Sequence, residues 1–270
     1  MCKFRGKKVC LTAAAVIILV LVTVAFCNRD FLDTAIRRKL FHDYSNISVT
    51  WYGDSNTFMN EYCQIVNDYF NFNGFNAGIN GSTVSGETIA GMCSLDRIIK
   101  DTPNDEEYIP KDSQIIFVMG GINDWLADIP LGKTTDGFYE VNSEDFLEEF
   151  YIPNNFSQGC NLMFYRLKRK FPDAYIVVLG TTFASAVEHE EFPGENDIYN
   201  SQGLSSTDYG RRLCEIAQMW GIRNINMGDC LDWNENNICE KTVDGIHFNK
   251  DVGALEVADI IIDFIKKSFK

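Results

Sequence analysis

The stretch SVTWYGDSNTF (residues 48–58) joins a strand-like pattern to a helix-like one through the tripeptide Gly-Asp-Ser. Alternating apolar and β-branched residues at about 47–52 predict a strand, and apolar residues at helical spacing predict a helix at about 57–70. Ser55 falls at the turn between them, where we expect it to be exposed near the positive end of the helix dipole. Ser55 is therefore a candidate nucleophile, although Gly-Asp-Ser alone is also an ordinary turn.

The alternation of strands and helices continues along the chain. Further strands are predicted in GFNAGI and at about 114–119, 174–181 and 222–227. Further helices are predicted at about 87–100, 207–219 and 251–267, and a long helical region with a break near Pro153 at about 143–170. The strands at 114–119 and 174–181 are almost continuously apolar, which is typical of strands covered on both faces. The pattern predicts an α/β protein with a parallel sheet between two layers of helices.

Three more polar segments lie where this arrangement would place chemistry. NAGING (residues 76–81) and GGIND (120–124) follow or end predicted strands, and VDGIHFN (243–249) precedes the last helix. Open parallel sheets bind their ligands at the carboxyl ends of the strands, so we expect these segments to gather near Ser55. Each one alone is explained as a turn or as a loop before a helix cap. All of them together, in this order, favour a shared site.

The residue types in these segments suit nucleophilic acyl chemistry. This chemistry needs a hydroxyl group, a base to take its proton, a group that orients the base and donors for the oxyanion. Ser55 supplies the hydroxyl, His247 the base and Asp244, three residues before it, the orienting carboxylate. The backbone N–H of Ser55, an N–H of the glycine-rich segment and the Asn123 amide are the candidate oxyanion donors.

These four blocks resemble those of the SGNH, or GDSL-type, hydrolase family, over about residues 45–268. YGDSNT matches the first block, NAGING the second (N-x-G-x-x-G), GIND the third (G-x-N-D) and DGIH the last (D-x-x-H). The resemblance implies a catalytic triad of Ser55, Asp244 and His247. It also implies an oxyanion hole made by Ser55, Gly81 (rather than Gly78) and Asn123.

The family resemblance further implies a three-layer α/β/α sandwich of flavodoxin-like type, with a five-stranded parallel sheet and neither a metal nor an organic cofactor. One position departs from the family's nickname, because Asn56 stands where that nickname has leucine. We expect this position to contribute little to the reaction.

The N-terminal part of the chain predicts a membrane anchor. Residues 1–8 are basic, and residues 9–27 are uncharged and long enough for a transmembrane helix. The basic cluster predicts that the segment 1–8 stays in the cytoplasm and that the rest lies outside, with 28–45 as a helical stalk and 46–270 as the hydrolase domain. Ala25-Phe26-Cys27 is an alternative signal-peptidase site, so a secreted form remains open.

Charge and cysteine content limit the classes of partner. The formal net charge is −14, and a surface this acidic disfavours nucleic acid. The sequence has no CxxC motif and only three scattered histidines, which argues against a zinc site. Six cysteines follow the apolar segment: Cys63, Cys93, Cys160, Cys214, Cys230 and Cys239. They either pair outside the cell, with Cys230–Cys239 as the local candidate, or remain free and buried.

The sequence therefore predicts an extracytoplasmic serine esterase. We expect its substrates to be O-acetyl or short acyl esters on cell-wall or extracellular carbohydrate, because membrane attachment and an exterior location suggest such esters. No long apolar lid segment is evident, which disfavours long acyl chains. Other small acyl esters or lipids, transfer of the acyl group to a glycan, and a non-catalytic carbohydrate-binding relative are the alternatives. The oligomeric state is left open.

Overall fold

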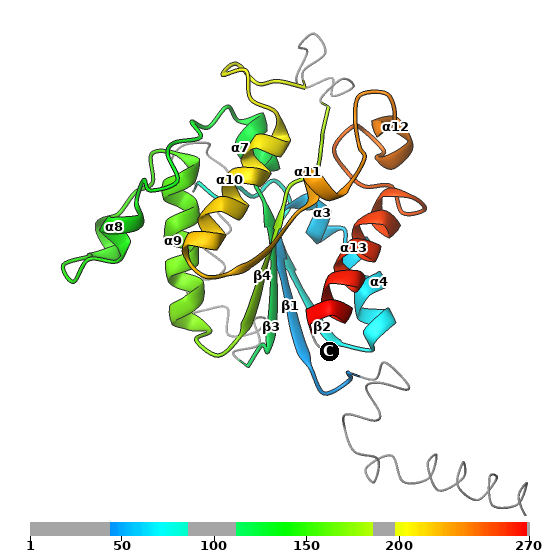
Figure 1. Cartoon of the computed structure of the whole chain (residues 1–270), viewed down its shortest axis with the longest axis horizontal. Helices are drawn as coiled ribbons and strands as arrows, with labels where there is room; N and C mark the ends of the chain where they lie inside the picture. Colours follow the sequence, from blue (N-terminus) through cyan, green and yellow to red (C-terminus); the bar gives the residue numbers. More distant parts are fainter. Residues whose placement is uncertain (1–43, 86–111, 186–197, 269–270) are drawn as a thin grey trace, which may run out of the picture. The chain divides into compact units, whose positions relative to one another are not determined.

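Five parallel strands form one sheet in the order β2-β1-β3-β4-β5 in the computed structural model (Figure 1). The structure describes residues 44–85, 112–185 and 198–268. The strands are β1 (Ser48–Gly53), β2 (Asn73–Gly78), β3 (Ile115–Gly120), β4 (Tyr175–Gly180) and β5 (Arg223–Asn226). This order is that of flavodoxin-like sheets, and the predicted five-stranded parallel sheet is confirmed.

Both faces of the central strands are buried, as their continuous apolar sequences predicted. In β1 and β3, Tyr52, Ile116 and Val118 belong to the main hydrophobic cluster together with residues of α9 (Phe156–Lys170) and α10 (Ser206–Met219). The intervening residues point the other way, because successive side chains of a strand alternate between faces. There Trp51 stacks on Phe117 with ring centroids 4.2 Å apart.

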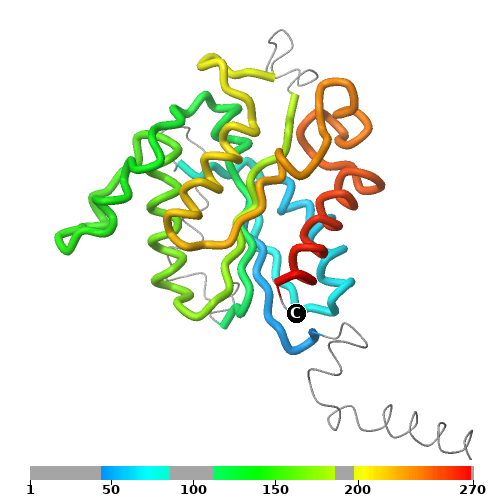
Figure 2. Tube along the Cα trace, in the orientation of Figure 1, coloured from blue at the N-terminus to red at the C-terminus, as the bar shows by residue number. Residues whose placement is uncertain are grey.

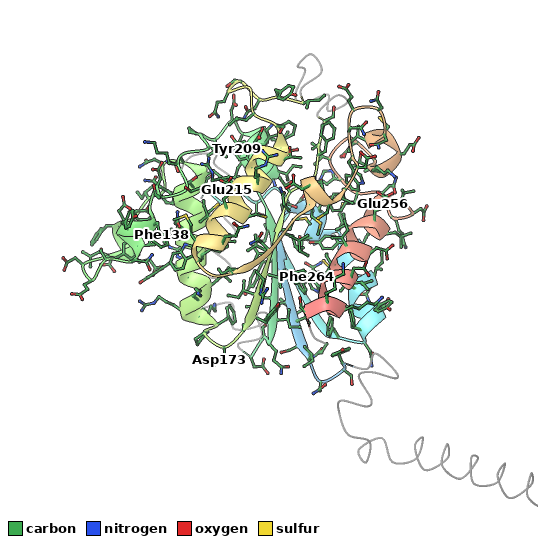
Figure 3. All side chains as sticks on the ribbon, viewed as in Figure 1. Phe138, Asp173, Tyr209, Glu215, Glu256 and Phe264 are labelled. Atoms are coloured by element: carbon green, nitrogen blue, oxygen red, sulfur yellow. The ribbon has the colours of Figure 1, made fainter. Side chains whose placement is uncertain are left out.

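Helices cover both faces of the sheet and complete the three layers (Figure 1). α9 and α10 lie on one side, and α4 (Glu61–Phe70) and α13 (Gly253–Ser268) lie on the other. Figure 3 shows the same division, with Tyr209 and Glu215 on α10 and with Glu256 and Phe264 on α13. The shorter helices are α3 (Ser55–Phe58), α7 (Ile122–Leu126), α8 (Phe138–Val141), η2 (Glu148–Phe150), α11 (Met227–Cys230) and α12 (Ile238–Lys241).

Two predicted helices differ from the observed ones. The helix predicted at 57–70 is divided into α3 and α4, because Asn60 adopts a left-handed conformation with φ of 66°. The helix predicted at 143–170 begins only at Phe156, where the Asn155 side chain caps it by accepting from the Gln158 N–H. Pro153 precedes this cap, close to the break that the sequence predicted, and residues before a proline disfavour the helical conformation.

Several predictions fall outside the described residues. These are the basic segment 1–8, the membrane anchor 9–27, nearly all of the stalk 28–45 and the helix at 87–100. Across 44–85, 112–185 and 198–268, no helix is both long enough and apolar enough to span a bilayer.

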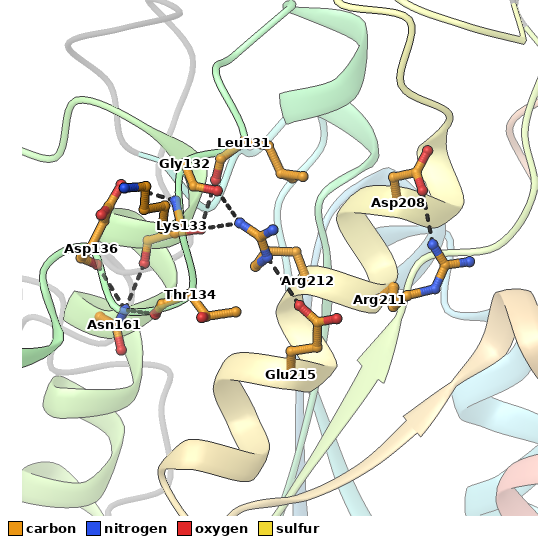
Figure 4. Close-up of polar contacts among 11 residues, drawn as sticks. Leu131, Gly132, Lys133, Thr134, Asp136, Asn161, Asp208, Arg211, Arg212 and Glu215 are labelled. Atoms are coloured by element: carbon orange, nitrogen blue, oxygen red, sulfur yellow. Dashed lines mark hydrogen bonds and ion pairs between the residues drawn. The ribbon is translucent and has the colours of Figure 1, made fainter.

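The loop after α7 is fastened to α9 and α10 by side chains that bind its carbonyl groups (Figure 4). Asn161 Nδ2 on α9 donates to the carbonyl oxygens of Thr134 and Asp136 at 3.1 and 2.9 Å. Arg212 on α10 donates to the carbonyl oxygen of Gly132. Because these half-buried acceptors are paired, this long connection is held against the helical layer.

The loops that follow the strands gather at one end of the sheet. Figure 2 shows the chain around residues 198–205 and 231–252, in yellow and orange, at the same end as the start of α3. The order of the strands reverses between β1 and β3, and open α/β sheets form their binding crevice at such a reversal. The carboxyl ends of β1 and β3 therefore define where a site should be sought.

Candidate active site

Ser55 is the first residue of α3, two residues after the carboxyl end of β1 at Gly53. Asp54 caps this short helix, and its Oδ1 accepts a hydrogen bond of 3.0 Å from the Asn56 N–H. Gly53 allows the turn to be tight, since a Cβ there would lie 2.0 Å from Thr57 Oγ1. Ser55 itself is only 5% exposed, so the expectation that the turn leaves it exposed is wrong.

His247 and Asp244 lie where a base and its orienting group are needed. His247 Nε2 is 2.9 Å from Ser55 Oγ, and His247 Nδ1 is 2.5 Å from Asp244 Oδ2. The second carboxylate oxygen of Asp244 accepts from the N–H groups of Ile246 and His247, at 3.0 and 2.7 Å. The structure thus brings all three predicted triad residues together in the order hydroxyl, imidazole and carboxylate.

The electrostatics of this pair favour an ionised Asp244. Partial burial would raise the pKa of Asp244, but the hydrogen bonds from His247 and Ile246 outweigh it and lower the pKa to about 2. The hydrogen bond to Asp244 raises the pKa of His247 above its ordinary 6.5, against the opposing effect of burial. The carboxylate therefore stabilises a proton on the imidazole, which a general base requires.

The predicted oxyanion donors lie on three neighbouring segments. Gly81, at a φ of 70°, belongs to the loop after β2, and Asn123 lies in the first turn of α7. Asn123 Nδ2 donates to the carbonyl oxygen of Ser82 at 2.8 Å, so its amide is placed directly beside the Gly81 loop. Among the described residues, neither the Ser55 N–H nor the Gly81 N–H has a hydrogen-bond acceptor. Within this part of the chain, both N–H groups are therefore available to a bound oxyanion.

Asp124 fixes the loop that carries Gly81, a role that the sequence reading missed. Its carboxylate accepts from the N–H groups of Val84 and Ser85, both at 2.9 Å, and its side chain is fully buried. Asp124 follows Asn123 directly in the GGIND segment, so one short helix positions both the amide and the loop beside it. The only available signal was its place in that segment.

Two buried carboxyl groups therefore lie beneath the candidate site. Burial raises the pKa of Asp54 to about 7, although the Asn56 N–H and His247 act in the opposite direction. Burial also raises the pKa of Asp124, against the hydrogen bonds from Ser85 and Val84. The charge of Asp124 adds to the rise in the pKa of Asp54, because a nearby carboxylate disfavours ionisation.

The cysteines in the described part of the chain are free thiols. Cys63, Cys160 and Cys214 are buried, whereas Cys230 and Cys239 are exposed and do not form the local bridge considered from the sequence. Burial raises the pKa of the three buried thiols, which makes them unreactive. Within the described ranges no cluster of three or more histidine, cysteine or acidic side chains could hold a metal ion.

Comparison with known proteins identifies the fold through structure rather than sequence. No protein-family model matches the chain, and no curated protein sequence matches it. In contrast, 44 chains of solved structures match. A possible lipase from Chitinophaga pinensis has a TM-score of 0.60 at 16% identity, covering 82% of this chain and 98% of that one.

Two further structures extend this comparison. A protein designated a GDSL-like lipase from Bacteroides ovatus has a TM-score of 0.52 at 16% identity, covering 82% of this chain and 98% of its own. The acetyl xylan esterase AlAXEase has a TM-score of 0.50 at 18% identity, covering 81% of this chain and 100% of its own. The chain therefore has the fold that these lipase-like and esterase structures share.

Proposed function

We propose that this protein is a serine esterase that hydrolyses carboxylic esters through Ser55, His247 and Asp244. The observation that carries the proposal is the continuous hydrogen-bonded series from Asp244 Oδ2 through the His247 ring to Ser55 Oγ, with spacings of 2.5 and 2.9 Å. The similarity to lipase-like and esterase structures supports the same chemistry.

In the first half of the reaction, Ser55 becomes acylated. Ser55 Oγ bonds to the ester carbonyl carbon while its proton moves to His247 Nε2. The carbonyl oxygen becomes an oxyanion, which the N–H groups of Ser55 and Gly81 and the Asn123 amide stabilise. The bond between the carbonyl carbon and the alcohol oxygen then breaks, and the proton on His247 Nε2 passes to the leaving alcohol.

In the second half, water releases the acid. His247 Nε2 takes a proton from water, and the water oxygen bonds to the acyl carbon. The bond from that carbon to Ser55 Oγ then breaks, and the proton returns to Ser55. Asp244 stabilises the imidazolium that forms in both halves.

The substrate class is a separate proposal. We propose acetyl or other short acyl groups on carbohydrate, a proposal that is supported by the similarity to an acetyl xylan esterase. Profiling acetylated oligosaccharides against p-nitrophenyl esters of increasing chain length tests it. A preference for long acyl chains would contradict the carbohydrate substrate while leaving the esterase in place.

The experiment that tests the esterase itself is labelling with a fluorophosphonate. We expect the wild type to form a covalent adduct at Ser55 and to hydrolyse p-nitrophenyl acetate, and we expect Ser55→Ala to do neither. Hydrolysis that survived in Ser55→Ala would refute the mechanism.

We also propose that residues 9–27 anchor this domain to a membrane with the hydrolase domain outside the cytoplasm, as their apolar length and basic flank suggest. Extraction of membranes with alkaline carbonate tests the anchor. An anchored protein stays in the pellet, whereas a secreted form appears in the medium without the first 27 residues.

A further inference from the structure

Asn56, the residue directly after the candidate nucleophile, is bonded to the backbone on both sides of His247. Its Nδ2 donates to the carbonyl oxygen of Ile246 at 3.3 Å, and its Oδ1 accepts from the Phe248 N–H at 3.0 Å. The side chain is 4% exposed, so water competes little for these bonds. A carboxamide suits this position because it is planar and can donate and accept at once.

The backbone of Asn56 is also held by a hydrogen bond. Its N–H donates to Asp54 Oδ1 at 3.0 Å, within the helix that begins at Ser55. The contacts therefore close a ring: Ser55 is covalently joined to Asn56, Asn56 binds the backbone flanking His247, and His247 Nε2 returns to Ser55 Oγ. Ser55 and His247 are 192 residues apart along the chain. Their spacing therefore depends on tertiary contacts such as those of Asn56.

Several other contacts preserve the shape of the His247 loop without reaching Ser55. The Val243 N–H donates to the carbonyl oxygen of His247 at 2.8 Å, and Thr242 and Phe248 form an antiparallel bridge. These bonds, and the bond between His247 and Asp244, lie within the loop. Loss of the Asn56 side chain would therefore leave the imidazole–carboxylate pair intact and remove the direct hydrogen bonds between its loop and the residue that follows the nucleophile.

We infer that Asn56 is a positioning residue that holds His247 Nε2 within hydrogen-bond distance of Ser55 Oγ. The inference rests on the proposed function, because proton transfer between these two atoms is what the contact serves. It gives the position after the nucleophile a larger role than the sequence reading expected. Asn56 acts through the backbone of the His247 loop and touches neither the substrate nor the proton.

The test measures the rate at which a fluorophosphonate labels Ser55 in wild type and in Asn56→Ala. This rate depends on removal of the Ser55 proton and not on deacylation. A displacement of reacting groups by about 1 Å can cost about 100-fold in rate, so we expect labelling and kcat to fall by about that factor. We expect KM for p-nitrophenyl acetate to stay within about twofold. We also expect the acid limb of the pH profile to keep its midpoint, since the pair with Asp244 is retained.

Asn161→Ala is the matched control. Asn161 is also a buried asparagine whose amide binds backbone carbonyls, but it lies on α9 and holds the loop after α7. We expect this variant to lose thermal stability and to be labelled within about twofold of the wild-type rate. A general loss of packing would slow both variants alike and would contradict the inference.

Asn56→Asp decides the question if Asn56→Ala does not fold. Aspartate keeps the acceptor for the Phe248 N–H and loses the donor to the carbonyl oxygen of Ile246. We therefore expect Ser55 in this variant to be labelled about tenfold more slowly than in wild type. A folded Asn56 variant that is labelled at the wild-type rate would overturn the inference while the esterase stands. Failure of wild type itself to be labelled would instead overturn the proposed function.

Discussion

The Ser185 N–H donates to the carbonyl oxygen of Gly245 at 3.0 Å, which joins the segment after β4 to the loop between Asp244 and His247. Gly245 has a φ of 84°, and a Cβ there would lie 1.9 Å from the carbonyl oxygen of Ser185. The two segments can approach this closely only because residue 245 has no side chain.

We therefore expect Gly245→Ala to displace the catalytic loop. The left-handed backbone alone costs an alanine about 1–2 kcal/mol, and relief of the contact with Ser185 must move Asp244 and His247. Activity should fall by at least about tenfold, because small displacements of reacting groups are costly. Thermal denaturation and p-nitrophenyl acetate hydrolysis measure the two effects.

Gly221→Ala is the control for this prediction. Gly221 has a similar φ of 64°, but a Cβ there would meet no atom within 4 Å. This variant should show the backbone cost in its free energy of unfolding and keep its activity. Equal activity losses in both variants would show that the contact with Ser185 does not position the loop.

The fold was predictable because its signals are local. The apolar strands at β3 and β4 and the alternation with helices were sufficient to predict a parallel sheet between helical layers. The division of the helix at Asn60 was not, because it depends on one residue in a left-handed conformation. Contacts from Asn56 and Asp124 to distant backbone groups were likewise hidden, since a sequence does not show which carbonyl or N–H lies nearby.

The pH dependence of hydrolysis should follow the protonation of His247. The neutral imidazole is the active form, and Asp244 raises the pKa of His247 above 6.5, so kcat/KM should fall as the pH drops through a midpoint above 6.5. In Asp244→Asn the main cause of this shift is removed, and the midpoint should move to lower pH. Activity at the plateau should also fall by about 10³–10⁴-fold, as the imidazole loses its orienting carboxylate. An unchanged midpoint would show that Asp244 does not pair with His247.

The stability of the fold should depend on the ionisation of Asp54. Burial raises the pKa of Asp54 from 3.8 to about 7, so the folded state binds its proton more tightly than the unfolded state between these values. Stability from this group is therefore present below about pH 4 and is lost as the pH rises toward 7. Asp54→Asn should keep the helix cap, since asparagine caps as well as aspartate, and should abolish this slope.

Urea unfolding at several pH values between 4 and 8 measures the effect of Asp54. We expect the wild type to lose on the order of a few kcal/mol relative to Asp54→Asn across this range. Parallel curves for the two proteins would mean that Asp54 does not titrate differently in the folded and unfolded states.

Asn123→Ala should reduce the stabilisation of the transition state without weakening substrate binding. The variant loses one oxyanion donor and the bond from Asn123 Nδ2 to the carbonyl oxygen of Ser82. Removal of one such donor costs about 3 kcal/mol, so kcat should fall by at least about 100-fold while KM changes little. A rise in KM at constant kcat would place Asn123 in substrate binding instead.

Asp124→Asn should loosen the loop that carries Gly81. Both carboxylate oxygens of Asp124 accept backbone N–H groups, from Val84 and Ser85, and an asparagine can offer only one acceptor there. The remaining N–H would be buried against the amide NH₂ group, which costs about 1–3 kcal/mol of stability. Because Gly81 belongs to the same loop, kcat should also fall, by at least about tenfold.

The comparison that isolates this effect is Asp136→Asn. Asp136 also uses a carboxylate oxygen to accept a backbone N–H, that of Lys133 at 2.9 Å, but it does so in the loop after α7. Its substitution should leave kcat within about twofold of wild type, whatever it does to stability. If Asp124→Asn lowered the melting temperature as predicted and yet kept full activity, the Gly81 loop would not need the buried carboxylate of Asp124 in order to bind the oxyanion. Gly81 would then be correctly placed by β2 and Asn123 alone.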